Sequence, residues 1–285
     1  MNVLILGGGF TGAAVATLAL ARGLPVAATT CSEARAASLR ALGVIPMVAS
    51  QLDADAVAAR LDARTRVLVT MPPDGRIDAA LTPLFARTRV GAIAYVSSTG
   101  VYGDASGHVD DQSRTARDSP RAASRLDAED AWRSVGATIV RAPAIYGPGR
   151  GLHLRLARGE ARGAAPGTNA ISRVHVEDLA AALVAVLTAG APRELYVMGD
   201  LEPAPHADVL RWICGALAIT PPPHDAEQSP VETLSHDRRA DSTRIRGRFD
   251  LTLRYPSYRE GYAQCIARDR TALDEALAAR ARERA

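Results

Sequence analysis

The chain has 285 residues, of which 47% are hydrophobic and 23% are charged, as in an ordinary globular protein. A chain of this length buries enough surface to fold without a metal or a disulfide framework. The formal net charge of +3 is small and spread along the sequence, which argues against a nucleic-acid-binding protein because such proteins concentrate their cations on one face. All 34 basic residues are arginine, so a catalytic or Schiff-base lysine is excluded.

The cysteines and the apolar runs bear on the compartment. Cys31, Cys214 and Cys265 lie far apart and are odd in number, so they form neither a metal-ligand pattern nor a disulfide framework. This usage predicts a reducing compartment, the cytoplasm. The opening sequence MNVLILGGGF has no basic n-region or cleavage signal, and no uncharged apolar run is long enough for a membrane span.

The first half alternates between strand-like and helix-like segments. Continuous apolar runs predict strands at 3–6, 26–30, 44–48, 67–70, 92–97 and 138–142. Helices are predicted at 11–22, 33–42, 53–62, 75–87 and 121–135. Ser32 and Gly43 are the cap residues of the second helix. This alternation predicts an α/β fold with a doubly wound parallel sheet covered on both faces, a Rossmann fold.

The second half has a different character. Residues 148–173 are rich in Gly, Arg and Ala and show no clear periodicity. Further helices are predicted at 177–189, 206–217 and 257–283, and a strand at 194–198. Arg150, His153 and Arg155 follow a Pro-Gly turn, where they either line a pocket for an anionic group or lie in solvent.

A glycine motif joins the first predicted strand to the first predicted helix. Gly7, Gly9 and Gly12 fit the spacing G-x-G-x-x-G, in which the glycines permit a tight turn, close approach to a pyrophosphate and close helix packing. The helix N-terminus offers free N–H groups and a positive dipole end to phosphates. The motif, with Phe10 and Thr11 inside it, therefore predicts a dinucleotide site. The alternative is a glycine-rich turn without a ligand.

The end of the second strand bears on which dinucleotide binds. An NAD site usually carries an acid about 20 residues after the first glycine, and none stands at this strand end. Thr30 and Ser32 could instead bond a 2′-phosphate, and Arg35 could pair with it. The pattern favours NADP over NAD, although Arg35 could also be a solvated helix residue.

Four motifs follow one another in the order of a known family. They are Tyr95-Val96-Ser97-Ser98-Thr99-Gly100-Val101-Tyr102-Gly103-Asp104, the segments 141–150 and 172–179, and the segment 254–261. With the glycine loop, they resemble the extended short-chain dehydrogenases/reductases, the NAD-dependent epimerase/dehydratase family. The resemblance implies that Ser98 is the catalytic Ser/Thr, that Ser97 lies at the cofactor and that Tyr102 lies near the same pocket.

One part of the family pattern is missing. The family carries Tyr-x-x-x-Lys on the next helix, where this chain has Arg121 and Arg125. Arg125 could still bind ribose or a phosphate, but arginine is a poor general acid. The resemblance is therefore to an atypical member, and Tyr102 is the first choice for the missing proton donor. Tyr146 and His175 are the alternatives, although a histidine between two valines also fits a packed strand end.

Two functional hypotheses follow. The first is an NAD(P)-dependent oxidoreductase, or an epimerase/dehydratase-like enzyme, acting on a small carbonyl, hydroxyl or sugar-like substrate. The second is a catalytically weak or inactive NAD(P)-binding sensor or interaction protein. We predict an NAD(P)-binding domain at 1–150 and a segment at 151–285 that completes the sheet and binds substrate. No metal, nucleic acid or membrane is expected, and the resemblance implies a homodimer through helices 75–87 and 121–135.

Overall fold

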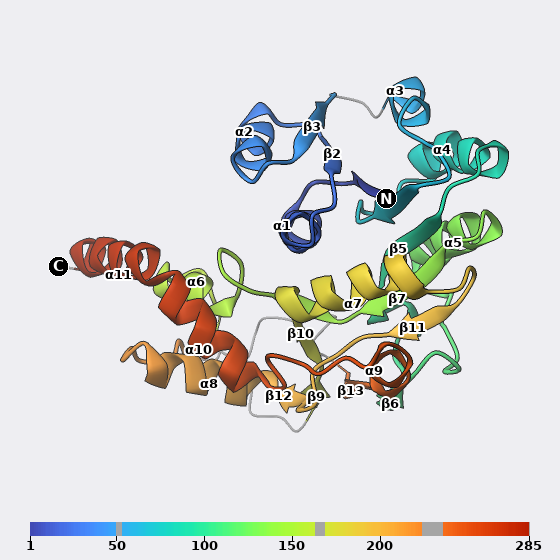
Figure 1. Ribbon diagram of the computed structural model, residues 1–285. Helices are drawn as coiled ribbons and strands as arrows, with labels where there is room; N and C mark the ends of the chain where they lie inside the picture. Colours follow the sequence, from blue (N-terminus) through green and yellow to red (C-terminus); the bar gives the residue numbers. More distant parts are fainter. Residues whose placement is uncertain (50–52, 163–168, 224–235, 285) are drawn as a thin grey trace.

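A parallel sheet of seven strands forms the centre of the computed structural model, which describes residues 1–49, 53–162, 169–223 and 236–284 (Figure 1). Its strands in spatial order are β11 (Leu195–Val197), β7 (Thr138–Ala142), β5 (Ala92–Ser98), β4 (Thr65–Val69), β1 (Asn2–Leu6), β2 (Val26–Thr30) and β3 (Ile45–Val48). The chain runs outward from β1 to β3 and then crosses to β4 on the other side of β1. Ligands bind at such a reversal of strand order, beyond the carboxyl ends of the strands.

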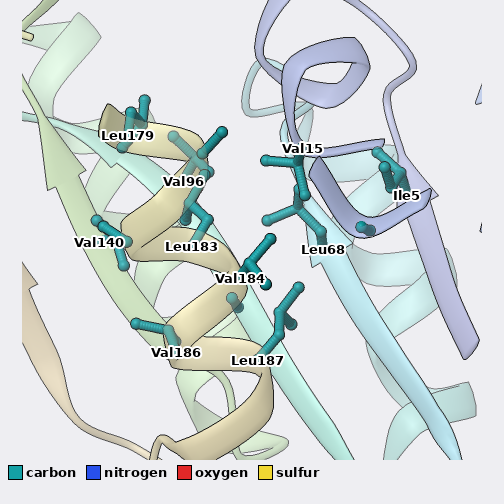
Figure 2. Packing of buried hydrophobic residues seen from close by; sticks show 14 of the residues in the cluster. Ile5, Val15, Leu68, Val96, Val140, Leu179, Leu183, Val184, Val186 and Leu187 are labelled. Atoms are coloured by element: carbon teal, nitrogen blue, oxygen red, sulfur yellow. The ribbon is translucent and has the colours of Figure 1, made fainter. Parts of the chain in front are cut away.

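Helices cover both faces of this sheet. One face carries α1 (Phe10–Ala21), α2 (Glu33–Ala41), α7 (Val176–Ala189) and α9 (Thr243–Phe249), and the other carries α3 (Ala54–Ala58), α4 (Gly75–Arg87) and α5 (Pro120–Ser134). Figure 2 shows side chains of α7 facing Val15 of α1 and Val96 and Val140 of the sheet. A sheet buried on both faces explains why its strands are continuous apolar runs and not alternating ones.

Capping residues set where the helices begin. The Ser32 side chain accepts a hydrogen bond from the backbone N–H of Arg35 at 3.3 Å, as its predicted cap role requires. Asp74 caps α4 in the same way, and Ser119 caps α5 just before Pro120, a residue whose fixed φ suits the first helical turn. Gly23 and Gly43 have positive φ after α1 and α2, a conformation that glycine tolerates best.

The remaining elements form a second group beside the carboxyl edge of the sheet. Short strands are β6 (Gly107–Val109), β8 (Ala144–Tyr146), β9 (Ala170–Ile171), β10 (Arg173–His175), β12 (Ala204–Pro205) and β13 (Arg238–Ala240). Helical segments are η1 (Thr99–Tyr102), α6 (Leu152–Ala157), α8 (His206–Ala216), α10 (Tyr258–Arg268) and α11 (Arg270–Arg284). Tyr146, Tyr258 and Tyr262 lie in a core shared by α6, α8 and α10. Within the described residues, no helix is both long and apolar enough to cross a bilayer.

The structure confirms the doubly wound sheet and differs from the predicted elements in detail. The predicted helix 53–62 is shorter, since α3 ends at Ala58. The predicted helix 257–283 is divided, because Asp269 separates α10 from α11. The segment 148–173 contains α6, β9 and the start of β10, and its residues 163–168 lie outside the described part of the chain.

Candidate functional site

The glycine loop forms the floor of the candidate site. Gly7 has φ of +107°, and a Cβ on Gly12 would lie 2.3 Å from the Gly7 carbonyl oxygen, so both positions require glycine. A Cβ on Gly9 would meet nothing within 4 Å, so the backbone there faces open space. Gly9 precedes α1 without a side-chain cap, which leaves the first N–H groups of the helix available to a ligand. These features fit the pyrophosphate of a dinucleotide.

A cleft of about 1550 Å³ opens over this loop. The predicted cofactor residues that line it are Gly7, Gly9, Phe10, Thr11, Thr30, Ser32 and Arg35. Met47 of β3 and Ile77 of α4 add apolar surface to its wall, which suits a flat base. Gly12 packs beneath the loop and is not part of the lining. The cleft thus brings together the glycine motif and the end of β2, as expected.

Basic residues outnumber acidic residues in the lining of the cleft. Its lining includes four arginines, namely Arg35, Arg60, Arg76 and Arg150. All four are exposed, and none forms an ion pair within the described part of the chain. The two acidic residues of the lining, Asp53 and Asp74, use their carboxylates to accept backbone N–H groups at the starts of α3 and α4. The cleft is therefore suited to a ligand with several negative charges.

Ser98 lies at the carboxyl end of β5 and is half-buried. Its Oγ accepts a hydrogen bond from the backbone N–H of Gly100 at 3.0 Å, and its own proton has no acceptor among the described residues. This hydroxyl is free to donate a hydrogen bond, but Ser98 is not among the residues that line the cleft. Ser97, the preceding residue, is buried and donates to Glu129 Oε1 at 2.5 Å. Ser97 faces the protein interior, so the structure does not place it in the cleft.

Tyr102 is buried, and its hydroxyl is already hydrogen-bonded within the protein. Its side chain is 1% exposed, and its hydroxyl donates to the Asp110 carbonyl oxygen at 2.5 Å while accepting from Arg141 Nη1 at 3.1 Å. Burial raises the pKa of Tyr102, although the Arg141 charge opposes this rise. Arg141 in turn forms a two-pronged buried ion pair with Glu129, at 3.0 and 2.7 Å. This placement indicates a structural role for Tyr102 and argues against the role of acid.

Arg121 and Arg125, which we expected at the family's Tyr and Lys positions, lie on α5. Arg121 is exposed and Arg125 is half-buried. The positive charge of Arg125 opposes the rises that burial causes in the pKa of Tyr95 and Asp78, which places it between α5, β5 and α4. Arg125 is not among the residues that line the cleft, so the structure does not bring it to the glycine loop.

Tyr146 and His175, the other candidate donors, are both buried, and their ring centroids lie 5.3 Å apart. Tyr146 is 3% exposed, stacks on Tyr262 at 4.4 Å between ring centroids, and donates to the Ser257 carbonyl oxygen at 3.4 Å. His175 is 1% exposed and caps α7 by accepting the Glu177 N–H on Nδ1 at 3.3 Å. Its Nε2 therefore carries the proton. Burial lowers the pKa of His175 to about 4, so the ring is neutral near pH 7.

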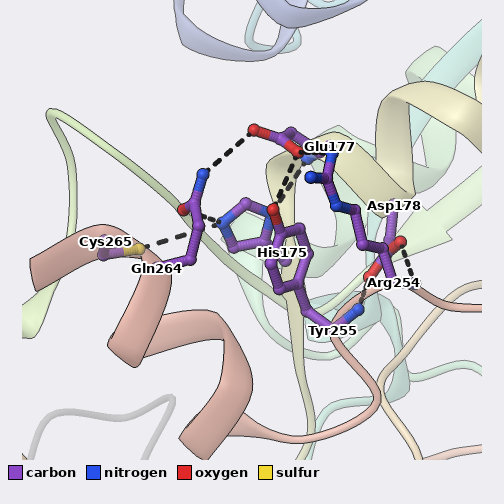
Figure 3. Close-up of polar contacts among 7 residues, drawn as sticks. All are labelled: His175, Glu177, Asp178, Arg254, Tyr255, Gln264 and Cys265. Carbon is purple, nitrogen blue, oxygen red and sulfur yellow. Dashed lines mark hydrogen bonds and ion pairs between the residues drawn. The ribbon is translucent and has the colours of Figure 1, made fainter. Parts of the chain in front are cut away.

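Figure 3 shows that His175 belongs to a polar cluster in which α7 holds the C-terminal motif. His175 Nε2 lies 3.2 Å from Gln264 Oε1. The two carboxylate oxygens of Asp178 accept the backbone N–H groups of Arg254 and Tyr255 at 2.8 and 2.9 Å. The cluster thus fastens 254–264 to the start of α7, and its polar groups are occupied in doing so.

This sheet order and this glycine loop together define the class of nucleotide-binding α/β proteins. The sequence model of the NAD dependent epimerase/dehydratase family matches residues 3–199. The chain belongs to this family. No match is found among curated proteins.

Solved structures show the same fold. A functionally unknown conserved protein from Silicibacter pomeroyi is 28% identical, with a TM-score of 0.84 over 93% of this chain and 98% of that one. The dTDP-glucose 4,6-dehydratase of Bacillus anthracis in complex with NAD is 17% identical, with a TM-score of 0.78 over 95% and 97%. The UDP-glucuronic acid 4-epimerase of Bacillus cereus, with UDP-glucuronic acid and NAD, is 15% identical, with a TM-score of 0.80 over 95% and 99%.

The sequence analysis missed two of the four cleft arginines, Arg60 and Arg76, whereas Arg35 and Arg150 were both named there as possible contacts of an anionic group. Arg60 follows α3, Arg76 lies in the first turn of α4, and Arg150 follows β8. Arg76 comes soon after the carboxyl end of β4, the edge at which ligands bind in such sheets, and this position could have flagged it. Arg60 has no comparable local signal.

Proposed function

We propose that this chain binds NADP(H) in the cleft over the glycine loop. The observation that carries this proposal is the set of four arginines without ion-pair partners among the described residues. Thr30, Ser32 and Arg35 lie together at the end of β2, where an NAD site usually has an acid. NADP carries one phosphate more than NAD, so it matches both the positive charge and the lack of an acid.

We propose further that the protein is an oxidoreductase of the extended short-chain type for a small carbonyl or hydroxyl compound. The bound dinucleotide supplies hydride chemistry. Ser98 Oγ, with its acceptor position taken by the Gly100 N–H, donates to the substrate oxygen and stabilises negative charge that develops there. With Tyr102 occupied by Asp110 and Arg141, the proton for that oxygen comes from solvent.

The second candidate function is an NADP sensor with weak or no catalysis. A specific observation favours it, because all three candidate proton donors are engaged elsewhere. Tyr102, Tyr146 and His175 are almost fully buried and hydrogen-bonded. Helix α5 contributes no tyrosine. Such a protein would still bind the dinucleotide, but hydride transfer would lack a well-placed acid.

A titration with NADPH and NADH, followed by fluorescence, tests the binding proposal. Gly9→Arg is the control, because the new side chain would occupy the open space above the loop while Gly9 has an ordinary φ of −75°. We expect NADPH to bind more tightly than NADH, and neither to bind the variant. Tighter binding of NADH would refute the NADP preference, and binding of neither cofactor to the wild type would refute the proposal itself.

A turnover assay on the wild type separates the two candidate functions, and Ser98→Ala tests the role of the serine. NADPH consumption is measured with a panel of small aldehydes and ketones. An oxidoreductase should show turnover that falls about 100-fold in the variant, the usual cost of removing such a donor, with NADPH affinity unchanged. Turnover that is absent in the wild type, with intact NADPH binding, would favour the sensor.

We also propose a cytoplasmic location, a homodimer through α4 and α5, and a substrate-binding portion within 151–285. The first rests on the cysteines, since Cys31 is exposed and Cys214 and Cys265 are buried and all three are unpaired, as in a reducing compartment. The dimer rests on the resemblance to the family. Light scattering of the purified protein tests it, and a monomer at micromolar concentration would refute it.

A further inference from the structure

A tight turn carries Arg150 toward the cleft from the second half of the chain. Gly147 and Arg150 exchange two backbone hydrogen bonds, of 2.9 and 3.0 Å. Pro148 and Gly149 form the centre of the turn, and Gly149 has φ of +77°. Proline followed by a residue with positive φ is the pattern of a type II turn. The backbone of Arg150 is therefore held in one place.

The turn rests directly on the glycine loop. The guanidinium carbon of Arg150 lies 5.3 Å from the centroid of the Phe10 ring, a cation–π distance. A Cβ on Gly147 would lie 3.2 Å from Phe10 Cζ and 2.6 Å from Val176 Cγ1, so the turn packs closely against this ring. Phe10 is the first residue of α1 and follows Gly9. The cation is thus placed at the mouth of the phosphate loop.

Asp269, between α10 and α11, holds the turn from the other side. Its Oδ2 accepts the Gly149 N–H at 2.7 Å and lies 2.7 Å from His153 Nε2. His153 is fully buried, and burial lowers its pKa, although Asp269 opposes that shift. The neutral ring donates its Nε2 proton to the carboxylate. One carboxylate oxygen therefore fixes both the turn and the start of α6.

We propose that Arg150 is a phosphate clamp that binds the pyrophosphate of the dinucleotide from the side facing α1, and that Asp269 is its positioning residue. The proposal rests on the proposed function, dinucleotide binding in this cleft. The planar guanidinium of arginine matches two phosphate oxygens at once, and the Phe10 ring and the fixed turn orient it before the ligand arrives. The pyrophosphate is common to NADP and NAD. Arg150 therefore acts on both cofactors, whereas Arg35, at the end of β2, distinguishes between them.

The experiment compares Arg150→Met with Arg35→Met by titration of each variant with NADPH and NADH. Methionine keeps an apolar stem on Phe10 and removes the charge. We expect Arg150→Met to lower the affinity for NADPH and for NADH by a similar factor of about ten or more. Arg35→Met should lower the affinity for NADPH alone. Unchanged affinities in Arg150→Met, or a loss confined to NADPH, would overturn the clamp while leaving the proposed function intact. If the wild type binds neither cofactor, the proposed function itself fails.

A double-mutant cycle tests the role of Asp269. Asp269→Ala should lower the affinity for both cofactors at least fivefold when Arg150 is present, and less than twofold in the Arg150→Met background. Asp269→Asn, which keeps an oxygen for both N–H groups, should restore wild-type affinity. An equal loss in both backgrounds would refute positioning through Arg150. If Asp269→Ala does not fold, Gly149→Ala distorts the same turn and must show the same dependence on Arg150.

Discussion

The cleft over the glycine loop and the polar cluster at the start of α7 use charge in opposite ways. In the cleft, Arg35, Arg60, Arg76 and Arg150 are exposed and form no ion pair within the described chain. In the cluster, Asp178 and His175 are buried and each is held by two hydrogen bonds. Unpaired charge in the cleft is available to a ligand, whereas paired polar groups in the cluster join distant segments of the chain. A charged residue is therefore assigned to binding or to folding by its partners and not by its type.

The buried ion pair between Glu129 of α5 and Arg141 of β7 gives the largest expected effect on stability, through Glu129→Ala. This change leaves Arg141 buried without its partner, so the free energy of unfolding should fall by about 3 to 5 kcal/mol. Urea denaturation measures it. The matched control is Glu33→Ala, because Glu33 forms an exposed pair with Arg40 and should cost less than about 0.5 kcal/mol. Equal effects of the two changes would show that the buried ion pair contributes no more to stability than the exposed one.

His175 should make stability depend on pH. Its pKa is about 4 in the folded chain, against 6.5 for an unperturbed histidine, so between these values the unfolded chain binds more protons than the folded one. The free energy of unfolding must then fall as pH drops from 6.5 to 4, by up to about 3 kcal/mol from this residue. His175→Asn keeps a capping side chain and removes the titration. The difference between the two pH curves isolates His175, since Asp178 is present in both. A constant difference would contradict the buried neutral ring.

In the cleft, Arg35→Met should weaken the binding of NADPH by about 1.4 kcal/mol, or tenfold. NADH affinity should stay within twofold, because NADH lacks the 2′-phosphate. Isothermal titration of both cofactors measures the ratio. Equal losses of affinity for the two cofactors would show that Arg35 does not contact the 2′-phosphate.

The smallest effects should come from cleft arginines in the absence of ligand. Arg60→Ala and Arg76→Ala should change the free energy of unfolding by less than about 0.5 kcal/mol, because neither side chain has an ion-pair partner in the described chain to lose. Thermal unfolding in ligand-free buffer measures this. A loss of about 2 kcal/mol or more would show that these arginines stabilise the fold in addition to any role in binding.

The sequence predicted the sheet well where local signals were strong. The strands 26–30 and 138–142 and the helix 75–87 agree with the structure to the residue, because buried apolar runs and capping residues mark them. Strands β8 and β9 were missed since they are only three and two residues long. The break at Asp269 was also missed, and the contact of its side chain with Gly149, 120 residues away in the sequence, has no local signal.

The candidate site shows the same division. The glycine loop and the end of β2 were predicted because each motif acts within a few residues of itself. The orientation of Tyr102 was not predictable, since four positions after Ser98 a side chain can turn either to the cleft or to Asp110 and Arg141. Arg60, Arg76 and Arg150 meet only because the fold brings three distant segments to one cleft.

The hydrogen bonds between Asp178 and the backbone of residues 254 and 255 have a consequence for the nascent chain. The bonded groups are separated by 76 and 77 positions in the sequence. At a synthesis rate of about 5 to 20 residues per second, the ribosome needs about 4 to 15 s to make the partners of this carboxylate. During that interval only water can donate hydrogen bonds to the Asp178 carboxylate in place of these two N–H groups. The start of α7 can therefore reach its final packing only after Tyr255 has been synthesised.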